Sequence, residues 1–242
     1  KEELAKQGYG WSPEGFLNAA RKGDKQAVFT YLSLGMDPNT QNAFGSTPLY
    51  AAVEVNQGPL VKLLVAAGAD PNVTNTQNVT PLMRAVELNL PGMVELLLAV
   101  GANPQTRNTE GWSPLFYAVQ TNNQAITERL IQGGLNPNEK DRLGATPLML
   151  AARKGFVEMV KLLVRQGGDV NEADTVGVPA LQVAVKDGNF QMVKVLLENG
   201  AKPDVPNRSG LTAMDIALAQ HDMSIANLLL AHGAKRPSVL GQ

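Results

Sequence analysis

The hydrophobic positions of this chain fall into short groups with helical spacing, each followed closely by glycine or asparagine. Residues 159–164 are a representative group, because Met159, Leu162 and Leu163 fall on one helical face and Gly167 follows them. The groups are far shorter than the roughly 20 apolar residues that span a bilayer. The pattern predicts an all-α chain built from pairs of short helices, with no transmembrane segment.

These groups recur with a period of 33 residues and no insertion. The helix-start position of the repeat is occupied by Thr47, Thr80, Ser113, Thr146, Pro179 and Thr212. An alanine column follows at Ala52, Ala85, Ala118, Ala151, Ala184 and Ala217, and a glycine column at Gly68, Gly101, Gly134, Gly167, Gly200 and Gly233. Self-similarity at a fixed period of this length predicts a stacked repeat array.

Three features of the repeat have local physical causes. Thr-Pro-Leu, as at Thr47, combines a hydroxyl N-cap with proline at the first helical position. A slot between the two helices predicts left-handed backbone, which glycine and asparagine tolerate best; it holds Gly23, Asn56, Asn89, Asn122, Gly155, Gly188 and His221. A third column is expected to accept hydrogen bonds from loop amides and not to bind metal; it holds Asn42, Asn75, Asn108, Asp141, Asp174 and Asn207.

Together, Gly-x-Thr-Pro-Leu-x-x-Ala, Gly/Asn, Val-x-Leu-Leu and Gly-Ala-Asp resemble the ankyrin repeat over residues 14–237. The resemblance implies an all-α repeat solenoid, a stack of helix-turn-helix units with β-hairpin fingers, in which fingers and first helices line a concave groove. Residues 1–11 are then an N-terminal leader or short helix, and 12–41 an N-terminal capping partial repeat. Residues 42–207 are five ankyrin repeats, and 208–242 a C-terminal capping repeat and tail. Lys235, Arg236 and Pro237 are expected to end the last helix.

Departures from the family pattern carry specific information. The usual histidine after Thr-Pro-Leu is absent, so packing is expected to replace its hydrogen bond; the column holds Tyr50, Met83, Phe116, Met149, Gln182 and Asp215. Proline arrives one position early at Pro179, which predicts a looser or shifted helix start. Arg84 stands at an otherwise apolar position and needs a partner such as Glu54 or Glu87, with contact to a ligand as the open alternative.

The composition and the absence of known motifs argue against several classes of function. The net charge is −1, which is no strong field for nucleic acid or an anionic membrane. The chain has two histidines, no cysteine, and no phosphate-binding-loop, HExxH or Gly-x-Ser-x-Gly pattern. We therefore expect no enzyme, no cofactor, no metal site, and neither nucleic acid nor membrane as a partner. The lack of cysteine and the start at Lys1 lean towards an exported protein, periplasmic or secreted.

Positions that the repeat leaves free are expected to bind the partner. An exposed apolar ridge is expected at Phe44, Val79, Trp112, Leu143, Val176, Val178 and Leu211. Trp112 is its expected centre, with Arg107 and Arg142 on adjacent fingers, although Trp112 could instead fold back onto its own finger. The predicted partner-binding residues are Phe44, Val79, Arg107, Trp112, Arg142, Leu143, Arg153 and Val176.

A second feature of these positions is a locally basic surface. It comprises Arg107, Lys140, Arg142, Arg153, Lys154, Lys186 and Arg208, with Glu110 and Asp187 as partial offsets. The sequence thus predicts a non-catalytic module, monomeric when unbound, that binds a protein, and an enzyme with an acidic-rimmed cleft suits it. The sharper hypothesis is an inhibitor or self-protection partner of an enzyme such as an exported hydrolase. The alternative is a structural adaptor or secreted effector that tethers two proteins, for which the charged outer helices offer no apolar surface.

Overall fold

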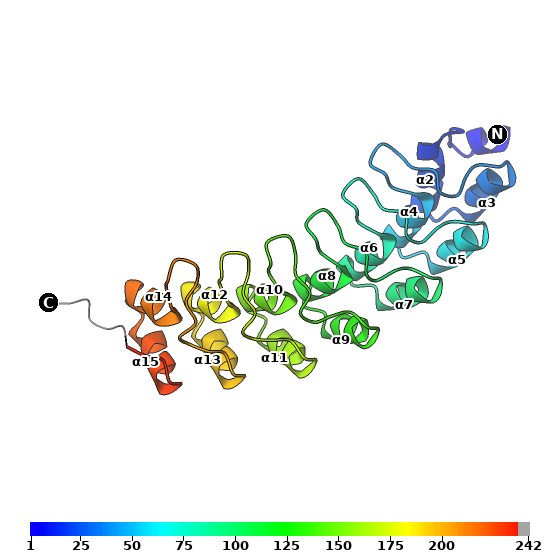
Figure 1. Ribbon diagram of the computed structural model, residues 1–242. Coiled ribbons are helices and arrows are strands. Elements are labelled where there is room, and N and C mark those ends of the chain that lie inside the picture. The colour runs from blue at the N-terminus through cyan, green and yellow to red at the C-terminus, as the bar shows by residue number, and fades with distance from the viewer. Residues whose placement is uncertain (237–242) are drawn as a thin grey trace. The chain divides into compact units, whose positions relative to one another are not determined.

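The computed structural model describes residues 1–236 and divides the chain into two compact units, Lys1–Tyr117 and Ala118–Gln242. Both units consist of pairs of short helices joined by tight turns (Figure 1). The first unit contains α1 (Glu2–Lys6), α2 (Pro13–Arg21), α3 (Lys25–Ser33), α4 (Pro48–Glu54), α5 (Gly58–Ala66), α6 (Pro81–Glu87) and α7 (Pro91–Ala99). The helix α8 (Pro114–Gln120) begins in the first unit and ends in the second.

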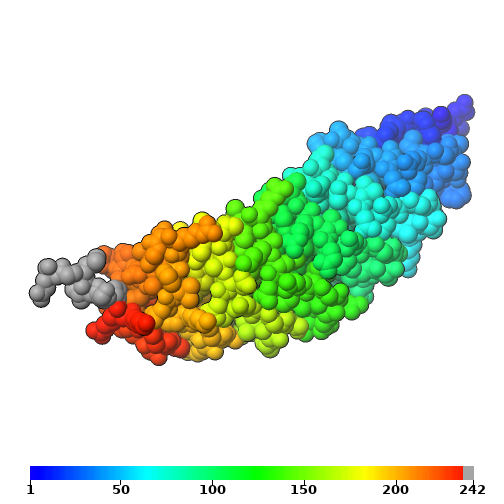
Figure 2. Space-filling model, in the orientation of Figure 1, coloured from blue at the N-terminus to red at the C-terminus, as the bar shows by residue number. Residues whose placement is uncertain are grey.

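The second unit continues the same alternation of shorter first helices and longer second helices. Its helices are α9 (Gln124–Gln132), α10 (Pro147–Arg153), α11 (Val157–Arg165), α12 (Ala180–Lys186), α13 (Phe190–Glu198), α14 (Ala213–Ala219) and α15 (Met223–Ala231). First helices stack on first helices and second on second, as α10, α12 and α14 do above α11, α13 and α15. Within each unit the colours of the space-filling view follow one another in order, because each repeat contacts its neighbours in sequence (Figure 2). The predicted all-α repeat solenoid is confirmed.

The local rules read from the sequence hold in the structure. Thr47 and Thr80 accept hydrogen bonds from the amides of Tyr50 and Met83, both at 3.1 Å, at the starts of α4 and α6. All seven residues of the slot between helices have positive φ, including His221 at 57°. The helix–turn geometry therefore follows from left-handed residues in every repeat, and from hydroxyl N-caps at α4 and α6, all of which are recognisable in sequence.

The predicted β-hairpin form of the fingers is wrong in detail. Each finger is closed by two backbone hydrogen bonds and not by a ladder: in the first finger, the Asn42 amide donates to the Ser46 carbonyl at 3.1 Å, and the Gly45 amide donates to the Asn42 carbonyl at 2.9 Å. In residues 1–236 the single β-bridge joins Ala173 and Pro179, and the secondary structure there contains no strand. A side chain also holds the loop: Asn42 Oδ1 accepts from the amides of Phe44 and Ser46, both at 3.0 Å. The whole Asn/Asp column repeats this arrangement.

A second asparagine column, not recognised in the sequence, links successive repeats. Asn171 donates from Nδ2 to the Gly200 carbonyl at 3.1 Å and accepts from the Lys202 amide at 2.8 Å. Asn138 makes the same two bonds with Gly167 and Asp169. These bonds span one repeat and satisfy backbone groups after each second helix, so they fix the spacing of neighbouring repeats.

The core lies between stacked helices, and the alanine column is completely buried at each of its six positions. The segment that precedes the first repeat is also part of the core, because α1 buries Leu4 and the Tyr9 amide donates to the Leu4 carbonyl at 2.8 Å. Tyr31 stacks on both Trp11 and Phe16, with ring centroids 5.5 and 4.8 Å away. This aromatic cluster covers the N-terminal end of the first unit.

Two predictions about helix ends need correction. α12 begins at Ala180, the position equivalent to Pro147 in α10, so a shifted start is wrong. The loss of the hydroxyl cap is confirmed, because Pro179 is the N-cap residue and provides no side-chain hydrogen bond. α15 ends at Ala231 with His232 as its C-cap, so Lys235 and Arg236 lie beyond the helix, and Pro237 lies outside the described residues. The Lys235 amide instead donates to Asp204 Oδ1 at 2.9 Å. Within residues 1–236, no helix is both long enough and apolar enough to cross a membrane.

Candidate partner-binding surface

The tips of three fingers present apolar side chains on a backbone held by hydrogen bonds. Phe44, Leu143 and Val176 occupy the same repeat position and are 71%, 68% and 56% exposed. In the second unit, the Leu143 amide donates to Asp141 Oδ1 at 2.8 Å, and the Leu143 carbonyl accepts from the Thr175 amide of the next finger at 2.9 Å. The backbone is thus ordered before any partner binds, while the apolar side chains remain in water.

Val79 does not belong to this surface, and its prediction is wrong. It is 7% exposed, and its carbonyl accepts from the Asn75 amide at 3.1 Å across the base of the finger. Val79 stands two residues after the tip, where the chain turns back towards the first helix, so its side chain enters the core. Ser46 and Ala145 occupy the same repeat position and are likewise buried.

Trp112 is half-buried against its own first helix and is not the centre of an exposed ridge. Its ring stacks on Phe116, with centroids 5.5 Å apart, and meets the edge of Tyr117 at 5.7 Å. The alternative in which Trp112 folds back is therefore closer to the structure, with its ring packed against α8 of the same repeat. The continuous ridge expected from the sequence is interrupted at Val79 and Trp112.

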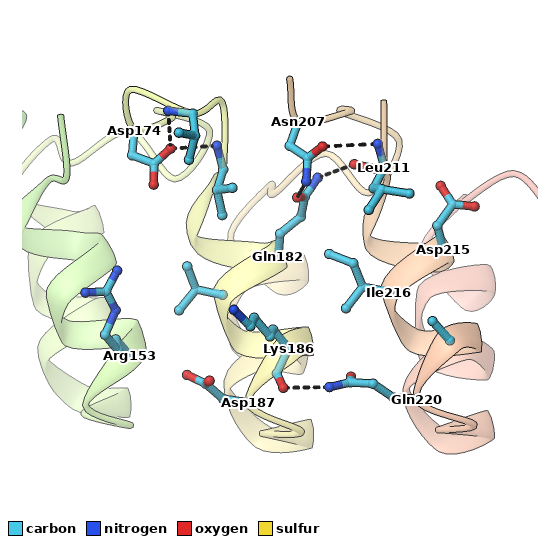
Figure 3. A pocket seen from close by; sticks show the side chains of 14 residues that line it. Arg153, Asp174, Gln182, Lys186, Asp187, Asn207, Leu211, Asp215, Ile216 and Gln220 are labelled. Carbon is cyan, nitrogen blue, oxygen red and sulfur yellow. Dashed lines mark hydrogen bonds between the residues drawn. The ribbon is translucent and has the colours of Figure 1, made fainter. Parts of the chain in front are cut away.

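The second unit has a groove of about 620 Å³ across the inner ends of three repeats (Figure 3). Its floor comes from α12 and α14, one end comes from α10, and the fingers form the wall. The lining residues are Arg153, Asp174, Val176, Val178, Gln182, Val183, Lys186, Asp187, Asn207, Leu211, Asp215, Ile216, Ala219 and Gln220. Of the predicted site residues, the structure brings Arg153 and Val176 to this groove.

The polar groups of the groove divide into two kinds. Asp174 accepts from the Val176 and Val178 amides at 2.9 Å, and Asp215 closes a capping box with Thr212, with Oδ2 2.8 Å from the Thr212 amide. These two carboxylates are therefore committed to the fold. Arg153 and Lys186 are exposed, and within residues 1–236 neither forms an ion pair.

Gln182 is a groove residue whose role was missed in the sequence. It is buried, and its Nε2 donates to the Val205 and Leu211 carbonyls, both at 2.9 Å, while Oε1 accepts from Asn207 Nδ2 at 3.1 Å. Gln182 thus replaces the family histidine by hydrogen bonding and not by packing. The signal was available, because Gln182 and Asp215 are the polar members of a column that is elsewhere apolar or aromatic.

In the first unit, charged side chains of the inner face form ion pairs with one another. Arg84 lies 3.1 Å from Glu54 and 2.8 Å from Glu87, as the sequence required. Arg21 approaches Glu54 at 3.8 Å. Burial raises the pKa of the neighbouring Tyr50 to about 12, although Arg84 opposes the shift. Arg84 therefore pairs with carboxylates of the protein itself.

The remaining predicted cations lie in both units and differ in their contacts. In the first unit, Arg107 donates from Nη1 to the Gly111 carbonyl of its own finger at 2.7 Å. In the second, Lys140 lies 2.6 Å from Glu172, so part of the expected basic surface is neutralised. Arg142 is exposed beside Leu143 at the tip of its finger.

The described residues hold no group of three or more His, Cys, Asp or Glu side chains that could bind a metal ion. His221 occupies a left-handed turn, and His232 Nδ1 lies 3.0 Å from the Leu228 carbonyl at the end of α15. His221 therefore lies in a turn between two helices, and His232 lies at a helix end.

Comparisons with known proteins identify the family. A model described as ankyrin repeats (3 copies) matches residues 16–108 and 89–174, and one described as ankyrin repeats (many copies) matches residues 181–230. The chain belongs to the ankyrin-repeat family. Domains of this family are generally protein-protein interaction modules and typically non-catalytic. No curated protein matches the chain.

Two solved structures illustrate the fold. The ankyrin-repeat domain of Bcl-3, described as a unique member of the IkappaB protein family, is 28% identical, with a TM-score of 0.79, over 90% of this chain and 99% of that chain. The human ASB11 ankyrin-repeat domain is 25% identical, with a TM-score of 0.77, over 93% of this chain and 99% of that chain. The fold of this chain is similar to that of both ankyrin-repeat domains.

Proposed function

We propose that this protein is a non-catalytic module that binds one specific protein partner through its finger tips and the groove of its second unit. The observation that carries the proposal is the pair Leu143 and Val176, whose backbones are held from both sides while their side chains are exposed. A contact surface ordered in advance loses little conformational entropy on binding. Exposed apolar side chains on such a surface supply the hydrophobic contact area.

In its sharper form, the proposal is that the partner is an enzyme and that the fingers enter its cleft and block it. Projecting tips with Leu143 and Val176, and the exposed cation Arg142 beside them, suit a cleft with an apolar floor and an acidic rim. An exported location, expected from the cysteine-free sequence, would place that enzyme in the periplasm or outside the cell. Fractionation of the native cell with an antibody to the chain tests the location.

One observation favours the adaptor alternative. Phe190 and Met223 begin α13 and α15 at equivalent repeat positions and are exposed, as is Phe29 on α3. The expectation that the outer helices offer no apolar surface is therefore wrong. An adaptor would hold one protein at the finger tips and a second at Phe190 and Met223.

The test uses the full chain as bait in an extract of the native cell, in three forms. These are wild type, Leu143→Lys/Val176→Lys at the finger tips, and Phe190→Lys/Met223→Lys on the outer helices. All four side chains are exposed, so each variant should fold. One protein captured by wild type and the outer-helix variant, but lost by the finger-tip variant, supports the proposal.

The same experiment separates the two forms of the proposal. If the captured protein is an enzyme, addition of the wild-type chain should inhibit its activity, whereas addition of the finger-tip variant should not. Two different proteins, each lost by one variant, would favour the adaptor. Equal capture by all three baits would contradict binding at the finger tips.

A further inference from the structure

The inner faces of the two units carry side chains of opposite charge at the same repeat position. At the last residue of the first helices, the first unit has Glu54 and Glu87, and the second unit has Arg153 and Lys186. One turn earlier on α6 stands Arg84, which pairs with both glutamates. The first unit thus supplies its own counter-charge.

The second unit lacks that internal counter-charge. The positions equivalent to Arg84 in the second unit are the apolar residues Leu150, Val183 and Ile216; Val183 and Ile216 line the groove, and Leu150 is buried. Arg153 and Lys186 are therefore left beside an aliphatic surface with no carboxylate from the equivalent column. The Lys186 carbonyl is already satisfied by Gln220 Nε2 at 2.8 Å, and the side-chain ammonium remains exposed.

The groove lining contains the two cations Arg153 and Lys186 and the three carboxylates Asp174, Asp187 and Asp215. Asp174 and Asp215 accept backbone hydrogen bonds at the finger end of the groove, away from the two cations. At the other end Asp187 is the one lining carboxylate, and Lys154, outside the lining, is a further exposed cation next to Arg153 in the chain. Figure 3 shows Arg153 and Lys186 on neighbouring helices at the end of the groove remote from the fingers.

We propose that the groove of the second unit binds a peptide segment of the partner in which aliphatic or aromatic side chains stand next to carboxylates. The apolar side chain packs between Val183, Ile216 and Leu211, and the carboxylate pairs with Lys186 and Arg153. This inference rests on the proposed function and specifies the chemistry of the partner. Charge-assisted hydrogen bonds at the edge of an apolar groove are stronger than the same pairs in open water, so they give both affinity and orientation.

The probe is a phage-displayed library of random linear peptides, selected on the immobilised full chain. No peptide is removed beforehand on the basis of its binding to Arg153→Glu/Lys186→Glu, so that the comparison with this variant stays open. Selected peptides should combine Asp or Glu with Leu, Ile or Phe. The synthetic form of an enriched peptide should bind wild type at least about tenfold more tightly than the charge-reversed variant, and its affinity should fall as salt rises.

Two further variants make the test specific. Leu211→Glu places a carboxylate on the apolar wall and should weaken the same peptide by a similar factor. Lys62→Glu makes the same lysine-to-glutamate change on the outer helix α5 of the first unit and should leave binding unchanged. Circular dichroism of all four proteins should be superimposable, because these side chains are exposed.

Several outcomes would overturn the inference. These are a selection that enriches nothing, peptides without acidic residues, or equal binding to the charge-reversed variant. If the finger-tip variant still loses the native partner while Arg153→Glu/Lys186→Glu retains it, the proposed function stands and this inference alone fails. If no bait captures a protein and no peptide is selected, both fail.

Discussion

The guanidinium of Arg84 lies 3.1 Å from the carboxylate of Glu54, which belongs to the preceding repeat of the first unit. The same side chain reaches Glu87 at 2.8 Å within its own repeat. Their side chains are 29% and 26% exposed for Arg84 and Glu54, so water screens this pair less than an open surface pair. Arg84 therefore holds two repeats together.

A double-mutant cycle with Arg84→Met and Glu54→Gln measures this link. We expect a coupling free energy of roughly 1 kcal/mol in urea unfolding, because the pair is partly buried and hydrogen-bonded. The coupling should shrink as salt is added. Strict additivity at low salt would mean that the pair does not contribute to stability.

Alkaline pH should destabilise the first unit through Tyr50. Burial raises the pKa of its phenol from 10.0 to about 12. The unfolded chain therefore ionises at Tyr50 first, and the stability present below pH 10 is lost as pH rises towards 12. Tyr50→Phe should show a shallower fall in the urea midpoint over this window, with part of the slope remaining because burial also raises the pKa of Tyr117.

Gln182→Leu should destabilise the second unit by roughly 1–3 kcal/mol, because it leaves the Val205 and Leu211 carbonyls and the Asn207 amide group without their partner. Gln182→His, which restores the usual residue of the family, should recover most of the loss. Urea unfolding followed by circular dichroism measures both. Equal stability of Gln182→Leu and wild type would show that water replaces these bonds at no cost.

Trp112→Ala should cost stability, contrary to the expectation from an exposed Trp112. Loss of the ring stacked on Phe116 should lower the free energy of unfolding by about 1–3 kcal/mol. Leu143→Ala is the matched control, because its side chain is exposed and its loss should change stability by less than about 0.5 kcal/mol. A Trp112→Ala protein as stable as this control would place Trp112 in solvent.

Pro179→Thr should stabilise the protein. Pro179 occupies the N-cap of α12 without a side-chain hydrogen bond, whereas Thr146 caps α10 at the equivalent position. A threonine hydroxyl that accepts from the Gln182 amide should add about 0.5–1 kcal/mol. Thermal unfolding tests this, with Pro179→Val as a control that matches threonine in shape without the hydroxyl. Similar stability of the two variants would contradict a capping effect.

The repeat architecture could be predicted from the sequence because its determinants are local. Left-handed glycine, asparagine and histidine, hydroxyl N-caps and the Asn/Asp column act on backbone within a few residues, so their spacing alone defines the unit. The partner of Arg84 was also predictable, since Glu54 and Glu87 occupy neighbouring positions of the repeat. These features depend on residue type and period, which are both present in the sequence.

The binding surface was only partly predictable, because exposure depends on how a side chain leaves its finger and what it then meets. Leu143 and Val79 stand two residues apart in the repeat, yet one is exposed and the other enters the core. Trp112 could be placed only when Phe116 provided a ring to stack on. Sequence alone determined the array and its local caps, whereas tertiary packing decided which side chains reach solvent and which charges keep their partners inside the protein.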